Sequence, residues 1–164
     1  MRILTIDRVN TLFEYDNGRL RRKITKTWNS PAGSYAGSVN KRGHVNVQVD
    51  GVMWAAHQII FLMFHGYIPK EIDHVNRDKT DNRIENLRKC SSTENKGNIG
   101  LLSNNRSGYR GVSFNTHRKK WRAQIKIKGR QTYLGSFDSP IQAAIAYNNA
   151  ALNHFGKFAY LNDV

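Results

Sequence analysis

The chain has 164 residues, with 26 Lys and Arg against 12 Asp and Glu, and a formal net charge of +14. This excess indicates a polyanionic partner, most commonly nucleic acid, and the 17 aromatic residues favour packed cores over a disordered basic tail. Residues 59–64 form the longest apolar run, which is too short to cross a bilayer, and the first residues lack the hydrophobic region of a signal peptide. We therefore expect a cytoplasmic protein with no membrane partner, in the host cell if a phage encodes it.

Residues 1–52 are predicted to form short strands joined by tight turns. Asn17-Gly18 separates two strand-like runs, and Asp50-Gly51 follows the alternating apolar residues of "HVNVQV". A helix is expected over residues 52–66, where apolar residues recur at helical spacing and a glycine ends the pattern. His57 lies on this helix. Core packing or partial exposure is the favoured interpretation of His57, and a role near an active site is the alternative.

A strand, a polar loop, a second strand and a helix are predicted in succession after Pro69. The strands are "EIDHV" (71–75) and "LRKCS" (87–91), and Ser91 with Glu94 has the spacing of a capping box. The Gly-, Asn- and Ser-rich stretch that follows is typical of a linker. We therefore divide the chain into a domain of residues 1–98, a linker of residues 99–108 and a domain of residues 109–164.

Three strands and one helix are predicted for the second domain. The strands are "YRGVSFN", "KWRAQIKIK" and "QTYLGSF", and Asp138 or Ser139 caps a helix that has Pro140 near its start and Gly156 at its end. The predicted fold class is α+β. N-terminal strands and a helix lead to a strand–strand–helix unit, and a three-stranded antiparallel sheet then packs on one C-terminal helix.

Asp73, His74, Asn86 and Asn95 lie in and around the polar loop between the first pair of strands. A neutral histidine, with an ordinary pKa of about 6.5, suits a general base. A hard divalent ion held by carboxylate and amide oxygens suits the charge that develops as a phosphodiester bond breaks. However, neighbours on a regular strand point to opposite faces, and Asp and Asn are also the ordinary residues of turns and caps.

The stretch "WAAHQIIFLMFHGYIPKEIDHVNRDKTDNRIENLRKCSSTEN" resembles the HNH endonucleases of phages and introns, in which Asp-His opens the motif and Asn closes it. The resemblance covers roughly residues 35–98. It implies a ββα-metal nuclease unit in which His74 is the general base, and Asp73 and Asn95 hold one divalent metal ion, Mg²⁺ or Mn²⁺. Asn86 would orient the loop that carries His74. The CxxC pairs of zinc-ribbon members are absent, so no structural zinc is expected.

The segments "YRGV", "YLGSF", "AAIAY" and "LN" follow one another over residues 109–162. Together they resemble the plant ethylene-response-factor (APETALA-type) DNA-binding domain, which is also found behind HNH nucleases in phage enzymes. The resemblance implies that a three-stranded sheet enters the DNA major groove while a helix packs on its other face. The plant domains carry further arginines and a tryptophan where this chain has Ser113, Gln131 and Tyr133, so their base preference does not transfer.

Strand alternation sorts the predicted sheet into an inner face and an outer face. Trp121, Ala123, Ile125 and Ile127 are expected to face the helix. The side chains expected to contact DNA, from the outer face and its turns, are Arg110, Ser113, Asn115, Arg118, Lys119, Lys120, Arg122, Gln124, Lys126, Lys128, Arg130, Gln131 and Tyr133. Residues 101–164 carry a net charge of +8, from 10 basic and 2 acidic residues. The alternative is a solvated basic face with no DNA contact.

The predicted function is that of a metal-dependent, site-specific endonuclease of the homing type. It would act on double-stranded DNA as a monomer or a dimer, by nicking or by double-strand cleavage. The alternative is a DNA-binding regulator whose nuclease unit is inactive, and the intact Asp73, His74, Asn86 and Asn95 argue against it. RNA binding fits the charge, but the aromatic stacking surface expected for single strands is missing.

Overall fold

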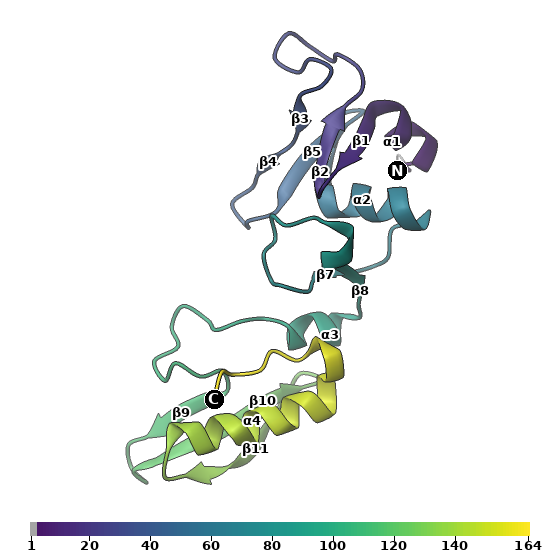
Figure 1. Ribbon diagram of the computed structural model, residues 1–164. Coiled ribbons are helices and arrows are strands. Elements are labelled where there is room, and N and C mark those ends of the chain that lie inside the picture. The colour runs from purple at the N-terminus through teal and green to yellow at the C-terminus, as the bar shows by residue number, and fades with distance from the viewer. Residues whose placement is uncertain (1–2) are drawn as a thin grey trace. The chain divides into compact units, whose positions relative to one another are not determined.

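The computed structural model describes residues 3–164 as two compact units, which divide between Lys89 and Cys90. Each unit combines small antiparallel sheets with helices, so the structure belongs to the mixed α and β class (Figure 1). The division differs from the predicted boundary after residue 98, because α3 (Ser92–Gly97) groups with the second unit.

The first unit begins with helix α1 (Ile6–Leu12), where short strands were predicted. Thr5 caps this helix, since its hydroxyl accepts a hydrogen bond from the backbone N–H of Arg8. Val9 is the one residue of α1 that is fully buried. Ile6, Val9 and Leu12 recur at three-residue spacing, but two helical turns are shorter than the window in which such a pattern separates a helix from a strand.

Two small sheets follow α1. The first contains β1 (Phe13–Asp16), β2 (Arg19–Arg22) and β3 (Tyr35–Ala36), and the second contains β4 (Ser38–Val39), β5 (Val45–Val49) and β6 (Val52–Ala55). Both predicted turns join hairpins: Asn17-Gly18 links β1 to β2, and Asp50-Gly51 links β5 to β6. All four turn residues have positive φ, the backbone conformation that such two-residue turns require.

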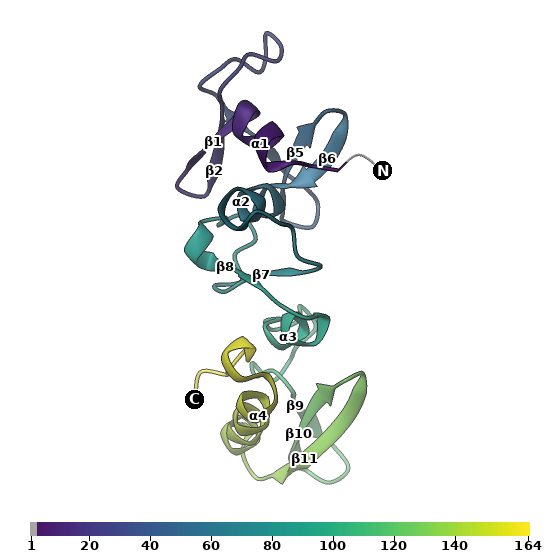
Figure 2. The same ribbon diagram turned by 90° about the vertical axis from the view of Figure 1, so that its right-hand side faces the viewer.

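The predicted helix over residues 52–66 is shorter in the structure, where α2 spans Ala56–His65. Residues 52–55 instead form β6, because the turn before them returns the chain along β5 and their backbone groups complete that ladder. Gly66 ends α2 as predicted, with φ of 77° and its N–H bonded to the Leu62 carbonyl. Helix α2 packs against β2, β5 and β6 (Figure 2). Its Ile59 and Ile60 are fully buried in the core of the unit.

The first unit ends with a short hairpin. Strand β7 (Ile72–His74) pairs antiparallel with β8 (Leu87–Lys89), and the single-turn 3₁₀ helix η1 (Ile84–Asn86) leads into β8. The strands lie where the sequence predicts them, although each is three residues long. The polar loop between them, residues 75–83, is therefore held at both ends by the same ladder.

The second unit contains α3, the sheet of β9 (Val112–Asn115), β10 (Lys120–Ile127) and β11 (Arg130–Phe137), helix α4 (Pro140–Phe155) and η2 (Gly156–Phe158). Strand β10 lies between β9 and β11, and all pairings are antiparallel. Helix α4 lies along one face of this sheet (Figure 1). The small side chains of Ala143, Ala144 and Ala151 are fully buried there, which lets the helix approach the strands closely.

Gly111 holds the entry to β9 in a conformation that only glycine fits well. Its φ is +75°, and a Cβ placed on it would overlap the Tyr147 ring of α4 and the Gln124 carbonyl of β10. We expect Gly111→Ala to lower the free energy of unfolding of the second unit by about 2–4 kcal/mol, from left-handed strain plus overpacking. Hydrogen exchange of backbone amides in this unit measures the change.

Gly129 is the matched control for this substitution. It lies in the turn between β10 and β11 with φ of +83°, and nothing lies within 4 Å of an added Cβ. Gly129→Ala should therefore cost about 1–2 kcal/mol from backbone strain alone. Equal losses for the two variants would show that the contact with Tyr147 has no energetic weight.

Candidate active site and DNA-binding face

Asp73 and His74 occupy the last two positions of β7, and both are about 5 % exposed. Asp73 pairs with Arg88 across the ladder, where the Arg88 Nε and Nη2 atoms lie 2.8 and 2.7 Å from the Asp73 Oδ2 atom. The strand ends at His74, and the N–H of Arg77 bonds to the His74 carbonyl to begin the polar loop. Adjacent positions of β7 thus carry a buried carboxylate and a buried imidazole, each with its own partners.

Asn82 fixes the orientation and the tautomer of His74. The Asn82 Nδ2 group donates to the Thr80 carbonyl at 3.1 Å, so its Oδ1 atom is the one that faces His74 Nε2, at 3.0 Å. A carbonyl oxygen can only accept, and His74 Nε2 must therefore carry the proton. The lone pair of the neutral ring then lies on Nδ1, the nitrogen that a general base would use. Asn82 is 2 % exposed, and sequence reasoning assigned it no role.

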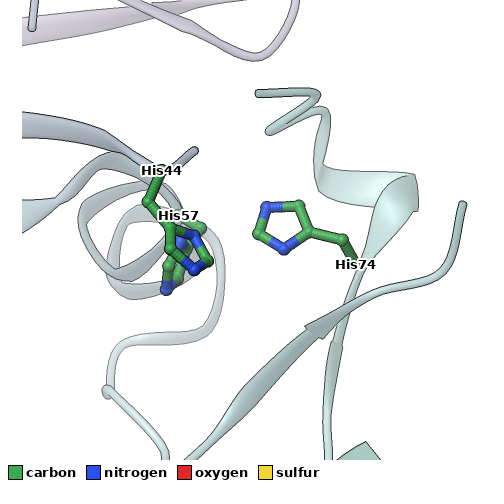
Figure 3. A group of neighbouring side chains, drawn as sticks. All are labelled: His44, His57 and His74. Carbon is green, nitrogen blue, oxygen red and sulfur yellow. The ribbon is translucent and has the colours of Figure 1, made fainter. Parts of the chain in front are cut away.

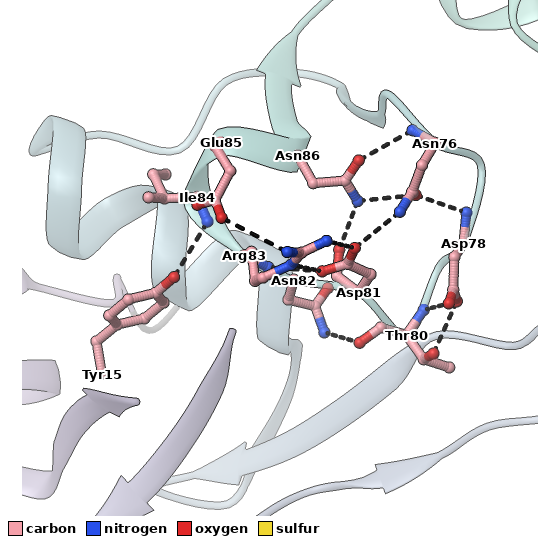
Figure 4. Close-up of polar contacts among 10 residues, drawn as sticks. All are labelled: Tyr15, Asn76, Asp78, Thr80, Asp81, Asn82, Arg83, Ile84, Glu85 and Asn86. Atoms are coloured by element: carbon pink, nitrogen blue, oxygen red, sulfur yellow. Dashed lines mark hydrogen bonds and ion pairs between the residues drawn. The ribbon is translucent and has the colours of Figure 1, made fainter. Parts of the chain in front are cut away.

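Asn86 ties together the two ends of the polar loop (Figure 4). Its Oδ1 atom accepts from the backbone N–H of Asn76 at 2.9 Å, and its Nδ2 group donates to the Asp81 carbonyl at 2.7 Å and to Asn76 Oδ1 at 2.9 Å. The Asn86 carbonyl also accepts from the Val75 N–H. These bonds give a rigid support to the loop residues that follow His74.

The acidic residues of the loop bond to other residues of the same loop and so stabilise its conformation. Asp81 forms a two-pronged pair with Arg83, and these hydrogen bonds hold the pKa of the Asp81 carboxyl far below its usual range. Asp78 accepts from both the N–H and the hydroxyl of Thr80, which lowers its pKa as well. The N–H of Ile84 donates to the Tyr15 hydroxyl at 3.2 Å, so the loop is also attached to β1 (Figure 4).

His44, His57 and His74 come together from three separate segments of the first unit (Figure 3). Their ring centroids lie 5.1 to 5.8 Å apart. Burial lowers the pKa of His57 to about 3, with smaller effects from the two neighbouring rings, and burial followed by the charge of Lys79 lowers the pKa of His44. The structure places the half-buried His57 ring beside His74, which fits the favoured interpretation of a packed or partly exposed residue, and a role of His57 near an active site stays a prediction. His44 carried no sequence signal.

Asn95 lies on α3, in the second unit. The predicted capping box is present: the Glu94 N–H donates to the Ser91 hydroxyl, and the Ser91 N–H donates to a Glu94 carboxylate oxygen at 2.7 Å. The backbone N–H of Asn95 bonds to the Ser91 carbonyl. The assignment of Asn95 as a metal ligand stays a prediction.

The face of the second sheet that α4 leaves uncovered is polar. Arg122 lies opposite Ser113 and Ser136 in the ladders, Gln124 lies opposite Tyr133, and Lys126 lies opposite Gln131. The Arg122 guanidinium lies 5.5 Å from the Tyr133 ring, and the Tyr133 hydroxyl bonds to Ser136. These six predicted DNA-contact residues form one surface, which we call the recognition face: Ser113, Arg122, Gln124, Lys126, Gln131 and Tyr133.

The other predicted contact residues lie in turns or have structural partners. Arg118, Lys119, Lys128 and Arg130 are exposed in or beside the two hairpin turns. Asn115 accepts from the Arg118 N–H and so holds the first turn, and Lys120 pairs with Asp138.

Arg110 differs most from its predicted role as a DNA contact. Its guanidinium donates to the backbone carbonyls of Lys96, Gly97 and Ile99, at the C-terminal end of α3. Burial lowers the pKa of Arg110, and the opposing effect of the nearby Tyr147 and Tyr160 is smaller. In this structure Arg110 holds α3 and the following chain together, and a base contact by Arg110 stays a prediction.

Comparison with known proteins identifies the family. Residues 55–96 match the HNH endonuclease family, a range that contains His57, Asp73, His74, Asn86 and Asn95. Protein 3.8 of Escherichia phage T7 is 32 % identical over 97 residues, which are 58 % of this chain and 79 % of that protein. An uncharacterized HNH endonuclease of Acanthamoeba polyphaga mimivirus is 32 % identical over 111 residues, which are 66 % of this chain and 57 % of that protein. The chain belongs to the HNH endonucleases.

This HNH endonuclease also matches plant proteins. APETALA2-like protein 2 of Oryza sativa is 43 % identical over 56 residues, which are 34 % of this chain but 13 % of the plant protein. The match is therefore partial, since it covers a small part of the plant protein. As an endonuclease the protein hydrolyses phosphodiester bonds of DNA. Within residues 3–164, no helix of the enzyme has the length and apolar character needed to cross a membrane.

Proposed function

We propose that this HNH endonuclease uses a divalent metal ion to cleave double-stranded DNA at preferred sites, in the manner of homing-type enzymes. The observation that carries the proposal is the state of His74. The ring is buried, its Nε2 proton is directed to Asn82, and the loop that follows it is held by Asn86. A preoriented neutral imidazole on a rigid loop is the arrangement that general-base catalysis requires.

The chemistry of the donor atoms fits a hard cation. Asp73 provides a carboxylate and Asn95 an amide oxygen, which suit Mg²⁺ or Mn²⁺. The ion, when bound, would supply positive charge to the phosphate under attack and to the departing 3′ oxygen. The chain itself contributes His74, whose Nδ1 atom accepts a proton from the attacking water. Asn82 keeps the proton on Nε2 while this happens, so it acts as a positioning residue.

Asn82 provides a test of that positioning. Asn82→Ala should lower kcat about tenfold or more, because the ring loses its preferred tautomer. Asn82→Asp should keep activity at high pH but move the acidic limb of the pH–rate profile upward, since a carboxylate favours protonated His74 and only the neutral ring is a base. Single-turnover cleavage rates from pH 5 to pH 9 distinguish the two variants. A lower rate in Asn82→Asp with an unmoved pH profile would mean that Asn82 acts on folding alone.

Site preference is assigned to the recognition face of the second unit. Phosphate contacts from the exposed turn residues would position the enzyme, and polar side chains of the sheet would contact base edges. The mixture of one guanidinium, one ammonium, two amides and two hydroxyls provides both donors and acceptors for such contacts.

Two kinds of substitution separate the proposed phosphate and base contacts. Lys119→Ala should weaken binding to every sequence alike and reduce the slope of log K against log salt by about 0.9. Gln124→Ala should cost about 1–3 kcal/mol on the preferred site and much less on other sequences. Fluorescence anisotropy with duplexes selected by the wild-type enzyme measures both. Lys157→Ala, which lies beyond α4, is the charge-matched control and should change neither quantity.

A further inference from the structure

Outside the proposed oxygen-ligand set, the first unit contains a second group of metal-ligand side chains. His44 comes from the turn before β5, His57 from the first turn of α2 and His74 from the end of β7. One ring nitrogen from each residue lies within 4.8 Å of the other two (Figure 3). Three imidazoles that converge from separate segments indicate a metal site far more specifically than an isolated surface histidine does.

Two of these rings have a buried nitrogen atom that makes no hydrogen bond within the described residues. The Nδ1 atoms of His44 and His57 are buried, and neither has a hydrogen-bond partner among residues 3–164. A buried nitrogen without a hydrogen-bond partner lowers the free energy of unfolding by about 1–3 kcal/mol, so its presence here calls for an explanation. Either ring nitrogen of a histidine can bind a metal ion, and an ion bound through Nδ1 would give the buried atom of His44 or of His57 its missing partner.

The third ring already has the support that a metal-bound histidine normally has. His74 donates its Nε2 proton to Asn82, and in protein metal sites the nitrogen opposite the ligand atom usually makes such a bond. In a tetrahedral site with metal–nitrogen distances of about 2.0–2.1 Å, the ligand nitrogens lie about 3.3 Å apart. Since the three nitrogens lie within 4.8 Å of one another, they must approach by at most about 1.5 Å to bind one ion.

The donor set also decides which ions are accepted. Three imidazoles with no carboxylate suit Zn²⁺, Co²⁺ or Ni²⁺ and hold Mg²⁺ poorly. The positive side chains of Lys79 and Arg42 lie near His44 and oppose any cation bound only by charge. We propose that His44, His57 and His74 form a three-histidine site for a transition-metal ion of the Zn²⁺ class, separate from the oxygen-ligand ion of catalysis.

A consequence for DNA cleavage follows, and this consequence rests on the proposed function. An ion bound to His74 occupies the lone pair that the base needs. Zn²⁺ should therefore inhibit cleavage supported by Mg²⁺, at the same concentrations at which it fills the three-histidine site.

Cobalt absorption tests the site directly, without reference to activity. The tag-free full chain is titrated with CoCl₂, and the wild type should give the intense visible bands of four-coordinate Co²⁺ at one ion per chain, which ZnCl₂ abolishes and MgCl₂ does not. His44→Gln and His57→Gln should each weaken binding at least about tenfold. His65→Gln is the matched control, since His65 is an exposed residue of the same helix as His57, and it should bind Co²⁺ as the wild type does.

Circular dichroism checks that the variants are folded. If His57→Gln is unfolded, the test rests on His44→Gln, because His44 is only half-buried. The wild type should also gain thermal stability with Zn²⁺, and His44→Gln should not. Absence of four-coordinate bands in the wild type, or equal affinity in all variants, would overturn the site. Cobalt bound by the three histidines in a protein that cuts no DNA would support the site and contradict the proposed function, while cleavage without any Co²⁺ binding would do the reverse.

Discussion

His74→Ala is expected to remove nearly all DNA cleavage while DNA affinity stays within a few-fold of the wild type. The ring lies at the end of β7 with its Nε2 proton committed to Asn82, so no other nitrogen can accept the proton of the attacking water in the same place. Loss of a general base typically reduces the rate by about 10² to 10⁴. Single-turnover cleavage of a labelled duplex and anisotropy titration of the same duplex measure the two quantities.

His65→Ala is the control for this variant, because it removes an exposed histidine from the same unit. Cleavage by His74→Ala at close to the wild-type rate would assign the role of base to another group. A parallel loss of DNA affinity would show instead that the substitution disturbs the loop between β7 and β8.

Asp73→Asn is expected to have the second largest effect, on the response to metal. The substitution removes the negative charge of a proposed ligand but keeps an oxygen that Arg88 can contact, whereas Asp73→Ala would also leave the mostly buried Arg88 without its carboxylate partner. The concentration of Mg²⁺ that gives half-maximal cleavage should rise at least about tenfold.

Cleavage rates at increasing MgCl₂, with MnCl₂ in parallel, measure this change. Asn95→Ala should move the curve in the same direction and by less, since an amide oxygen is the weaker ligand. If neither substitution alters the metal titration while both lower the maximal rate, the ligand assignment is wrong.

Local chemistry made part of the fold predictable. Asn17-Gly18 and Asp50-Gly51 supply the positive φ values of two hairpin turns, and the Ser91–Glu94 pair supplies both bonds of a capping box. Each of these features depends on a few adjacent residues. Strand alternation likewise placed Ala123 and Ile125 in the core.

Features that depend on contacts between distant segments were not predictable from the local sequence pattern. Residues 52–55 carry a helical pattern but complete the ladder beside β5. Arg110 has the sequence context of a DNA contact, and its guanidinium instead binds the carbonyls at the end of α3.

The candidate site shows the same division. Asp73, His74 and Asn86 were proposed as site residues from their motif, and the structure adds the bonds by which Asn86 holds the loop. The roles of Asn82 and of the histidine cluster were not predictable, because they depend on the direction of an amide and on the meeting of three distant segments.

One experiment tests the central claim most directly. A defined duplex is incubated with the wild-type enzyme and with His74→Ala, each with MgCl₂, with MnCl₂ or with EDTA, and the products are separated on a denaturing gel. We expect discrete cleavage products from the wild type with either metal ion, none with EDTA, and at least about 100-fold slower cleavage by His74→Ala. Wild-type cleavage that persists in EDTA, or equal rates for the two proteins, would contradict the account.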